Sequence, residues 1–168
     1  GVGVHKDSGF LTLLLQDQNP GLEAQANDNT WYAVDPVADS LVVNIGELLQ
    51  LVTHNYFIAT PHRVINRIGR VRYSSAFFYS PDLNTVLDPL PIDSVYIDEV
   101  MRSERHRNEG LMASRAEMAG GTSGMASQLK SAVFGDRYWQ RWVRSYPEIA
   151  RKFYPRLMQQ EPGRAGKD

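Results

Sequence analysis

Short apolar segments separated by turn-forming residues fill the first half of the chain. Clusters of asparagine, aspartate, proline and glycine mark the turns, as in Asn19-Pro20-Gly21. The apolar pattern predicts strands at residues 2–7, 10–16, 22–26, 41–45, 57–67 and 70–79, with a short one around Trp31, Tyr32 and Val34. Many short strands of this kind favour a mainly β fold, a double-stranded β-helix (jelly roll), over an α/β fold. The two sheets of a jelly roll enclose a pocket whose mouth admits a small molecule.

The most apolar of these segments is residues 10–15, which predicts a strand buried on both faces. A fully buried leucine contributes roughly 1.5–3 kcal/mol of transfer free energy. We therefore expect this strand and the preceding one to form a rigid support for functional side chains.

The pattern becomes helical after residues 88–91, where two prolines interrupt the chain. Residues 98–118 predict a helix in which arginine and glutamate are interleaved. A solvated helix is the favoured interpretation, and a lid over a substrate site is the alternative. The composition of residues 120–124 predicts a flexible linker.

Two more helices are expected near the C-terminus. Asp136 is expected to cap a helix that carries Trp139 and Trp142 on an apolar stripe, and Pro147 suits the first turn of the next helix. The tail after Pro155 is expected to be disordered. The predicted organisation is therefore a jelly-roll core at residues 1–92, a region of C-terminal α-helices at 93–158 and a tail at 159–168.

Composition narrows the function classes. The 168 residues suffice for one domain with a sizeable core, and a net charge of -1 gives no electrostatic footprint for nucleic acid or an anionic membrane. We expect neither as a partner, and the sequence contains no apolar run long enough to span a membrane. The chain has no cysteine, which fits a cytoplasmic location and means that any bound metal must be held by histidine and carboxylate.

Histidine and aspartate occur together at His5-x-Asp7. Residues two apart on an extended strand project from one face, so His5 and Asp7 can reach one point in space. An imidazole and a carboxylate make two thirds of a 2-His-1-carboxylate triad, which holds iron(II) on one side and leaves the other side open. His62 is the expected third ligand, whereas His54 and His106 are expected to be a turn residue and a helix surface residue.

Arg72 and Ser74 form a second candidate group, ten and twelve residues after His62. Gly69 suggests a turn between them and His62. One interpretation of Arg72 is a structural salt bridge to a nearby Asp or Glu. The other is bidentate capture of a ligand carboxylate, with the Ser74 hydroxyl as a further donor to the same carboxylate.

These residues lie within segments that resemble the catalytic half of a known family. The segments are GVGVHKDSGFLTLLLQD, PGLEAQ, LVVNIGELLQLVT, ATPHRVINR and RYSSAFFYSPDLNTVLDPLP. In this order and spacing, over about residues 1–92, they are similar to the C-terminal catalytic half of iron(II)/2-oxoglutarate-dependent dioxygenases of the isopenicillin N synthase-like type. His54-Asn55 stands where that family tends to have Asn-Gly.

The resemblance implies that His5, Asp7 and His62 bind Fe(II), and that Arg72 and Ser74 anchor the far carboxylate of 2-oxoglutarate. It further implies that dioxygen is consumed while 2-oxoglutarate is decarboxylated to succinate and a small-molecule substrate is hydroxylated. Two alternatives stay open: an oxidase of the same fold that takes no 2-oxoglutarate and binds its substrate's own carboxylate, or a non-catalytic jelly-roll binding module.

The chain opens only four residues before His5, whereas the family has a helical N-terminal half before this point. We therefore expect a piece of a longer protein. Uncovered sheet faces and unpaired strand edges are a liability in water. Poor solubility or association with a second chain is the corresponding expectation.

Overall fold

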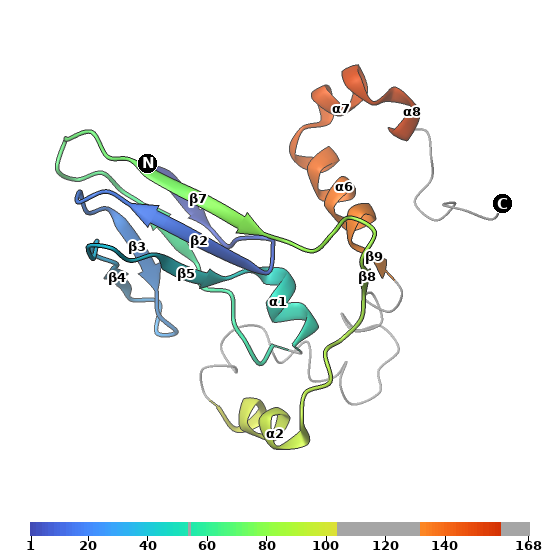
Figure 1. Cartoon of the computed structure of the whole chain (residues 1–168), viewed down its shortest axis with the longest axis horizontal. Helices are drawn as coiled ribbons and strands as arrows, with labels where there is room; N and C mark the ends of the chain where they lie inside the picture. Colours follow the sequence, from blue (N-terminus) through green and yellow to red (C-terminus); the bar gives the residue numbers. More distant parts are fainter. Residues whose placement is uncertain (54, 104–131, 159–168) are drawn as a thin grey trace. The chain divides into compact units, whose positions relative to one another are not determined.

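The computed structural model describes residues 1–53, 55–103 and 132–158 (Figure 1). Within these ranges the chain divides into two compact units. The first comprises residues 1–81 and 88–103, and the second comprises residues 82–87 and 132–158. No helix among the described residues is long and apolar enough to cross a membrane.

Two antiparallel sheets make up most of the first unit, as the mainly β prediction requires. The first sheet has the order β1-β6-β3-β4, and the second has the order β5-β2-β7. The strands of the first sheet are β1 (Val2–His5), β6 (His62–Val64), β3 (Leu22–Gln25) and β4 (Trp31–Ala33). Those of the second are β5 (Val42–Ile45), β2 (Leu11–Gln16) and β7 (Ser74–Tyr79).

The central strand of the second sheet presents two different faces. Alternation places Thr12, Leu14 and Gln16 on one face of β2 and the remaining leucines on the other. The cross-strand partners of the first set are polar at both ends: Thr12 pairs with Asn44 on β5, and Gln16 pairs with Ser74 on β7. Polar side chains therefore gather along one face of an otherwise apolar sheet.

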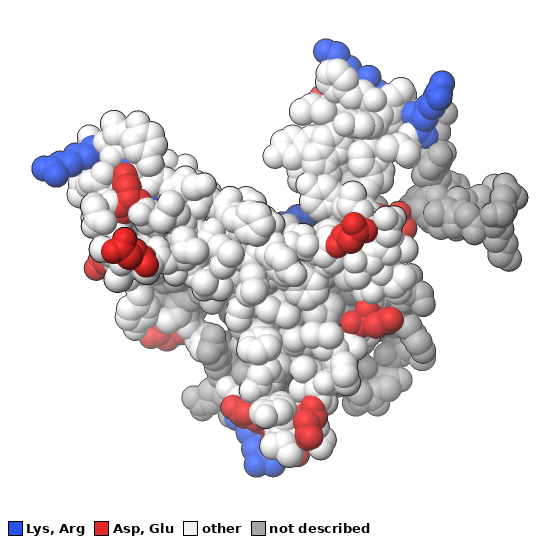
Figure 2. All heavy atoms as spheres, viewed as in Figure 1, with Lys and Arg blue, Asp and Glu red and all other residues white. Residues whose placement is uncertain are grey.

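The expectation that β2 is buried on both faces is wrong for the described chain. Leu15 is 53% exposed, and Phe77 and Phe78 on the adjacent strand β7 are each 62% exposed. Figure 2 shows an uncharged surface over the middle of β2 and β7. The apolar residues do form strands, but the sequence pattern does not show whether each face of a strand is covered.

Helix α1 (Glu47–Val52) joins the second sheet to the loop after β1. The Glu47 amide donates to the Asp7 carbonyl at 2.7 Å, and the Leu48 amide donates to the Gly9 carbonyl at 3.1 Å. A Cβ on Gly46 would overlap the Gly9 carbonyl oxygen, so only glycine allows this approach. The helix start thereby fixes the backbone around Asp7.

Glu23, Arg63 and Arg67 form an ion-pair group on one face of the first sheet. Glu23 on β3 is the cross-strand partner of Arg63 on β6, and its carboxylate accepts hydrogen bonds from Arg63 at 2.7 Å and Arg67 at 2.9 Å. The Arg63 guanidinium also lies 4.0 Å from the centroid of the Trp31 ring. Because neighbouring residues on a strand point to opposite faces, this arrangement directs His62 to the other side of the sheet.

Several predicted boundaries need correction. The strand expected at residues 57–67 is only His62–Val64, because it pairs with two short strands, β1 and β3. Pro61, just before it, predicts an edge strand or an irregular pairing. The strand is central in its sheet, and its pairing with β1 is irregular. The strand expected at 70–79 begins at Ser74, and Gly69, with φ of 65°, makes the predicted turn.

Helix α2 (Ser94–Arg102) begins earlier than the predicted residue 98. The rest of that predicted helix, the linker at 120–124, His54 and His106 lie outside the described residues. Asn55 adopts a φ of 64°, as expected for a turn residue at that point.

The second unit pairs β8 (Val86–Leu87) with β9 (Ala132–Val133), and three helices follow: α6 (Phe134–Ser145), α7 (Pro147–Phe153) and α8 (Pro155–Met158). Pro147 begins α7 as predicted. Asp136 does not cap α6, because β9 runs directly into the helix and Val133 takes the N-cap position. The disorder expected after Pro155 is wrong for α8, and residues 159–168 lie outside the described ranges.

Aromatic rings hold these helices together. The Trp139 and Trp142 rings stack at 5.3 Å, and Tyr154 packs edge-on against each at 5.6 Å. Such pairs add about 0.5–1.5 kcal/mol each beyond burial. The rings therefore pack on one another between α6 and the end of α7.

Candidate metal centre

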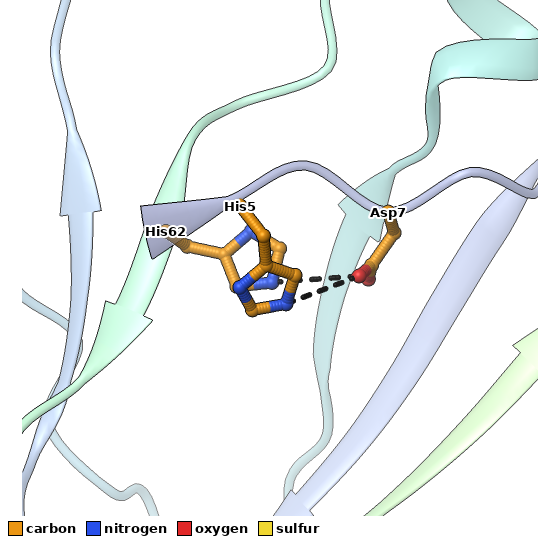
Figure 3. A group of neighbouring side chains, drawn as sticks. All are labelled: His5, Asp7 and His62. Atoms are coloured by element: carbon orange, nitrogen blue, oxygen red, sulfur yellow. Dashed lines mark ion pairs between the residues drawn. The ribbon is translucent and has the colours of Figure 1, made fainter. Parts of the chain in front are cut away.

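Two histidines meet because their strands are neighbours. His5 ends β1, His62 begins β6, and the two are cross-strand partners with ring centroids 4.2 Å apart. Asp7 lies in the loop just beyond β1, and its Oδ1 atom is 3.5 Å from His5 Nε2 and 3.7 Å from His62 Nε2 (Figure 3). The potential ligand atoms of the three residues all lie within 4.8 Å of one another.

The predicted convergence is present, but it does not arise from a continuous strand. β1 ends at His5, and its pairing with β6 contains a register irregularity between Val2 and His5. Asp7 is placed by the loop, whose carbonyl at that residue accepts the first amide of α1. Packing of the loop against α1 therefore replaces the simple two-residue alternation of a strand.

In each imidazole Nε2 is the nitrogen near Asp7, and Nδ1 contacts a backbone carbonyl. His5 Nδ1 lies 2.8 Å from the Gly3 carbonyl oxygen, and His62 Nδ1 lies 3.0 Å from the Thr60 carbonyl oxygen. A carbonyl only accepts, so Nδ1 is the donor in both contacts, and Nε2 is the nitrogen that faces Asp7. This contact is typical of metal-binding histidines, because it fixes both the tautomer and the orientation of the ring.

The two oxygens of the Asp7 carboxylate have different contacts. Oδ2 accepts hydrogen bonds from Thr12 Oγ1 at 2.5 Å and from Asn44 Nδ2 at 2.9 Å. Oδ1 faces the two imidazoles. Two ring nitrogens and one carboxylate oxygen form the donor set of a facial iron(II) site, so the residues present fit that metal.

Charge at this carboxylate follows from the same contacts. Burial raises the pKa of Asp7, but the hydrogen bonds from Thr12 and Asn44, together with the His62 and His5 charges, outweigh it. The net result is a pKa below the ordinary value, so Asp7 is ionised at neutral pH. The centre therefore offers one anionic carboxylate oxygen beside two imidazole nitrogens.

The sequence reasoning missed Thr12 and Asn44. The only signal for them was a single polar residue in each of two apolar segments, LTLLL and LVVNI. Because β2 and β5 pair, Thr12 and Asn44 lie opposite each other and both donate to the Asp7 carboxylate. That pairing depends on the fold and is not visible in either segment alone.

The second candidate group lies at the far end of β2. The Arg72 guanidinium donates to Ser74 Oγ, to Gln16 Oε1 and to the Asn19 carbonyl oxygen. All three acceptors are uncharged. The structure therefore brings Arg72 and Ser74 together as predicted, and it adds Gln16, which the sequence reasoning missed.

The family model that describes the 2OG-Fe(II) oxygenase superfamily matches residues 1–81, a span that contains all five candidate residues. Over these residues, about half of its length, the chain is similar to the 2OG-Fe(II) oxygenase superfamily. The resemblance inferred from the sequence is thereby confirmed. The mainly β fold with C-terminal helices is confirmed as well.

Three similar proteins illustrate the match. The chain is 42% identical over 92 residues to the 2-oxoglutarate-Fe(II) type oxidoreductase hxnY of Emericella nidulans, covering 54% of this chain and 26% of that protein. It is 29% identical over 160 residues to a 2-oxoglutarate-dependent dioxygenase of Gibberella zeae, covering 95% and 42%. The crystal structure of a Neurospora crassa protein in complex with alpha-KG and thymine matches with a TM-score of 0.51 and 30% identity, covering 54% and 29%.

The chain thus spans about a quarter of hxnY and two fifths of the Gibberella protein. The match to the Gibberella protein includes the region that follows residue 92. The five candidate site residues keep their predicted roles as predictions, now with the geometry described above.

Proposed function

We propose that this chain carries the iron(II)- and 2-oxoglutarate-binding part of an oxygenase that oxidises a small molecule. Oxidative decarboxylation of 2-oxoglutarate to succinate would be coupled to hydroxylation or a related oxidation of the substrate. The observation that carries the proposal is the convergence of His5 Nε2, His62 Nε2 and Asp7 Oδ1 at one point. The names of the relatives, which refer to 2-oxoglutarate and Fe(II), support the same cofactors.

His5, Asp7 and His62 would hold the iron. The bound ferrous ion supplies the activation of dioxygen and the electron chemistry that protein side chains lack. The protein's part is placement: the Nδ1 contacts aim both imidazoles, and the Oδ2 contacts of Asp7 leave Oδ1 to the metal. Three ligands on one side leave the opposite side for cosubstrate and dioxygen.

Arg72 and Ser74 would bind the distal carboxylate of 2-oxoglutarate. A planar guanidinium presents paired N–H donors that match the two oxygens of a carboxylate. The Ser74 oxygen accepts from Arg72 at 3.0 Å, so its own O–H is available as a donor. A cation and a hydroxyl donor thus converge at one place.

The test is anaerobic addition of Fe(II) and 2-oxoglutarate to the protein, followed by exposure to oxygen. A visible charge-transfer band before oxygen and succinate afterwards are the expected results. His62→Ala should lose stoichiometric iron, whereas Arg72→Ala should keep iron and require more 2-oxoglutarate. Arg70→Ala, a change to an exposed arginine on the preceding turn, is the matched control.

Three results would count against the proposal. Stoichiometric iron in His62→Ala would remove that residue from the metal centre. Turnover without succinate would favour the oxidase that takes no 2-oxoglutarate. No charge-transfer band with the unaltered protein would favour a non-catalytic binding module.

A further inference from the structure

Arg72 is held from three sides by acceptors that carry no charge. Nε donates to the Asn19 carbonyl oxygen at 3.1 Å, Nη1 to Ser74 Oγ at 3.0 Å and Nη2 to Gln16 Oε1 at 2.7 Å. A guanidinium has five N–H groups, so two remain after these contacts with described residues, one on each terminal nitrogen. Each of the two can donate to an oxygen of a bound carboxylate.

The Gln16 side chain can make this contact in only one orientation. Its Nε2 donates to the Val34 carbonyl oxygen at 3.4 Å, while its Oε1 accepts from Arg72. Arginine only donates and a carbonyl only accepts, so the amide oxygen must face the guanidinium. Gln16 is also the cross-strand partner of Ser74, which places both Arg72 contacts on one face of the sheet.

The segment after Gln16 is fastened to the segment that carries Arg72. The Asp17 carboxylate accepts from the Tyr73 amide at 2.7 Å and from the Asn19 amide at 2.9 Å. Asn19 Nδ2 donates to the Val71 carbonyl oxygen at 2.8 Å. Residues 16–19 and 71–73 therefore form one hydrogen-bonded block, and the acceptors around Arg72 cannot shift independently of it.

We propose that Gln16 is a positioning residue for the distal carboxylate of 2-oxoglutarate, acting through Arg72. This inference rests on the proposed function. Gln16 fixes the direction of the guanidinium by accepting one N–H. Because the amide is neutral, it adds no negative charge to that of Asp17, which already lies near Arg72. A glutamate of the same length would offer a similar acceptor but would offset the positive charge of Arg72. The chemistry of this position therefore favours an amide over a carboxylate.

The experiment is anaerobic titration of the iron(II)-loaded protein with each of two ligands. Calorimetry and the visible absorption band measure the binding. 2-Oxoglutarate has a distal carboxylate, whereas 2-oxobutyrate has the same keto-acid head without it. Gln16→Met removes the acceptor, and Gln16→Glu keeps the length and adds a charge. Gln18→Met, at an exposed residue of the same segment, is the matched control.

Gln16→Met should weaken binding of 2-oxoglutarate about tenfold or more, the usual consequence of losing a hydrogen bond to a charged group. Gln16→Glu should weaken it further, and neither variant should change the affinity for 2-oxobutyrate. Gln18→Met should bind both ligands as the unaltered protein does. Thermal unfolding of each variant identifies a change that merely disturbs the fold, and Gln16→Glu then serves as the second test.

Unchanged 2-oxoglutarate affinity in both Gln16 variants would overturn the inference. An equal loss for both ligands would also overturn it, because the effect would then not act through the distal carboxylate. If the unaltered protein bound iron but neither keto acid, the proposed function itself would fail. These outcomes are therefore distinguishable.

Discussion

Replacing Thr12 with valine would remove one hydroxyl group and nearly preserve the side-chain shape. Thr12 and Asp7 are only 4% and 7% exposed, and their hydrogen bond measures 2.5 Å. A hydrogen bond to a charged group contributes about 1.5–3 kcal/mol, so the metal-free variant should lose up to about that much free energy of unfolding. Changes to the groups that orient metal ligands typically cost about 10–100-fold in metal affinity, and we expect a loss of this size for iron(II).

The effect should depend on pH. One of the two hydrogen bonds that lower the pKa of Asp7 is lost, so that pKa rises in the variant. A carboxylate with a depressed pKa stabilises the fold above its ordinary value of 3.8 and loses this contribution as pH falls through the folded-state pKa. The stability difference between the two proteins should therefore be largest at neutral pH and shrink below about pH 4.

Urea unfolding of the metal-free proteins and anaerobic titration with iron(II) measure the two effects separately. Thr85→Val makes the same change at a half-buried threonine of the second unit and should leave iron affinity unchanged. Asn44→Leu removes the other donor to the same oxygen, so the double variant should show a coupling of about 0.5–3 kcal/mol with Thr12→Val. If Thr12→Val unfolded at the same urea concentration and bound iron equally well, the hydroxyl would have no role in holding Asp7.

Three further changes test other parts of the fold. Glu23→Gln should destabilise the protein at pH 7, because hydrogen bonds from Arg67 and Arg63 lower the pKa of Glu23. In acid titrations followed by circular dichroism this difference should fade below about pH 4.5, the ordinary value; a constant difference would contradict it. Gly46→Ala should destabilise the first unit by about 2 kcal/mol or more in urea, since the new Cβ would overlap the Gly9 carbonyl; an unchanged midpoint would refute the close approach. Trp142→Ala should cost the second unit about 1–3 kcal/mol and abolish the coupled near-ultraviolet signal of the stacked indoles; a retained signal would contradict the stacking.

Residues whose function depends on a local motif were predictable from the sequence. His5, Asp7 and His62 were predicted as a metal-binding group, and the structure brings their ligand atoms together. Arg72 and Ser74 were predicted to act on one ligand group, and they are in hydrogen-bond contact. Their chemical roles stay predictions, which the experiments above address.

Residues whose function depends on strand pairing were not predictable in the same way. Thr12 and Asn44 lie on different strands and meet only because β2 and β5 pair in one register. The predicted length of the strand at 57–67 was wrong for a related reason, because β6 extends only as far as its short partners β1 and β3 reach. An apolar alternation shows where a strand is possible, whereas its neighbours decide where hydrogen bonds form.

The candidate centre lies on the seam between two sheets. Its imidazoles belong to β1 and β6 of one sheet, while the groups that fasten its carboxylate belong to β2 and β5 of the other. A metal ion bound to His5, Asp7 and His62 would therefore link the two sheets to each other. Chelation should then loosen the sheets from each other before either sheet melts, and amide exchange would rise first along that seam.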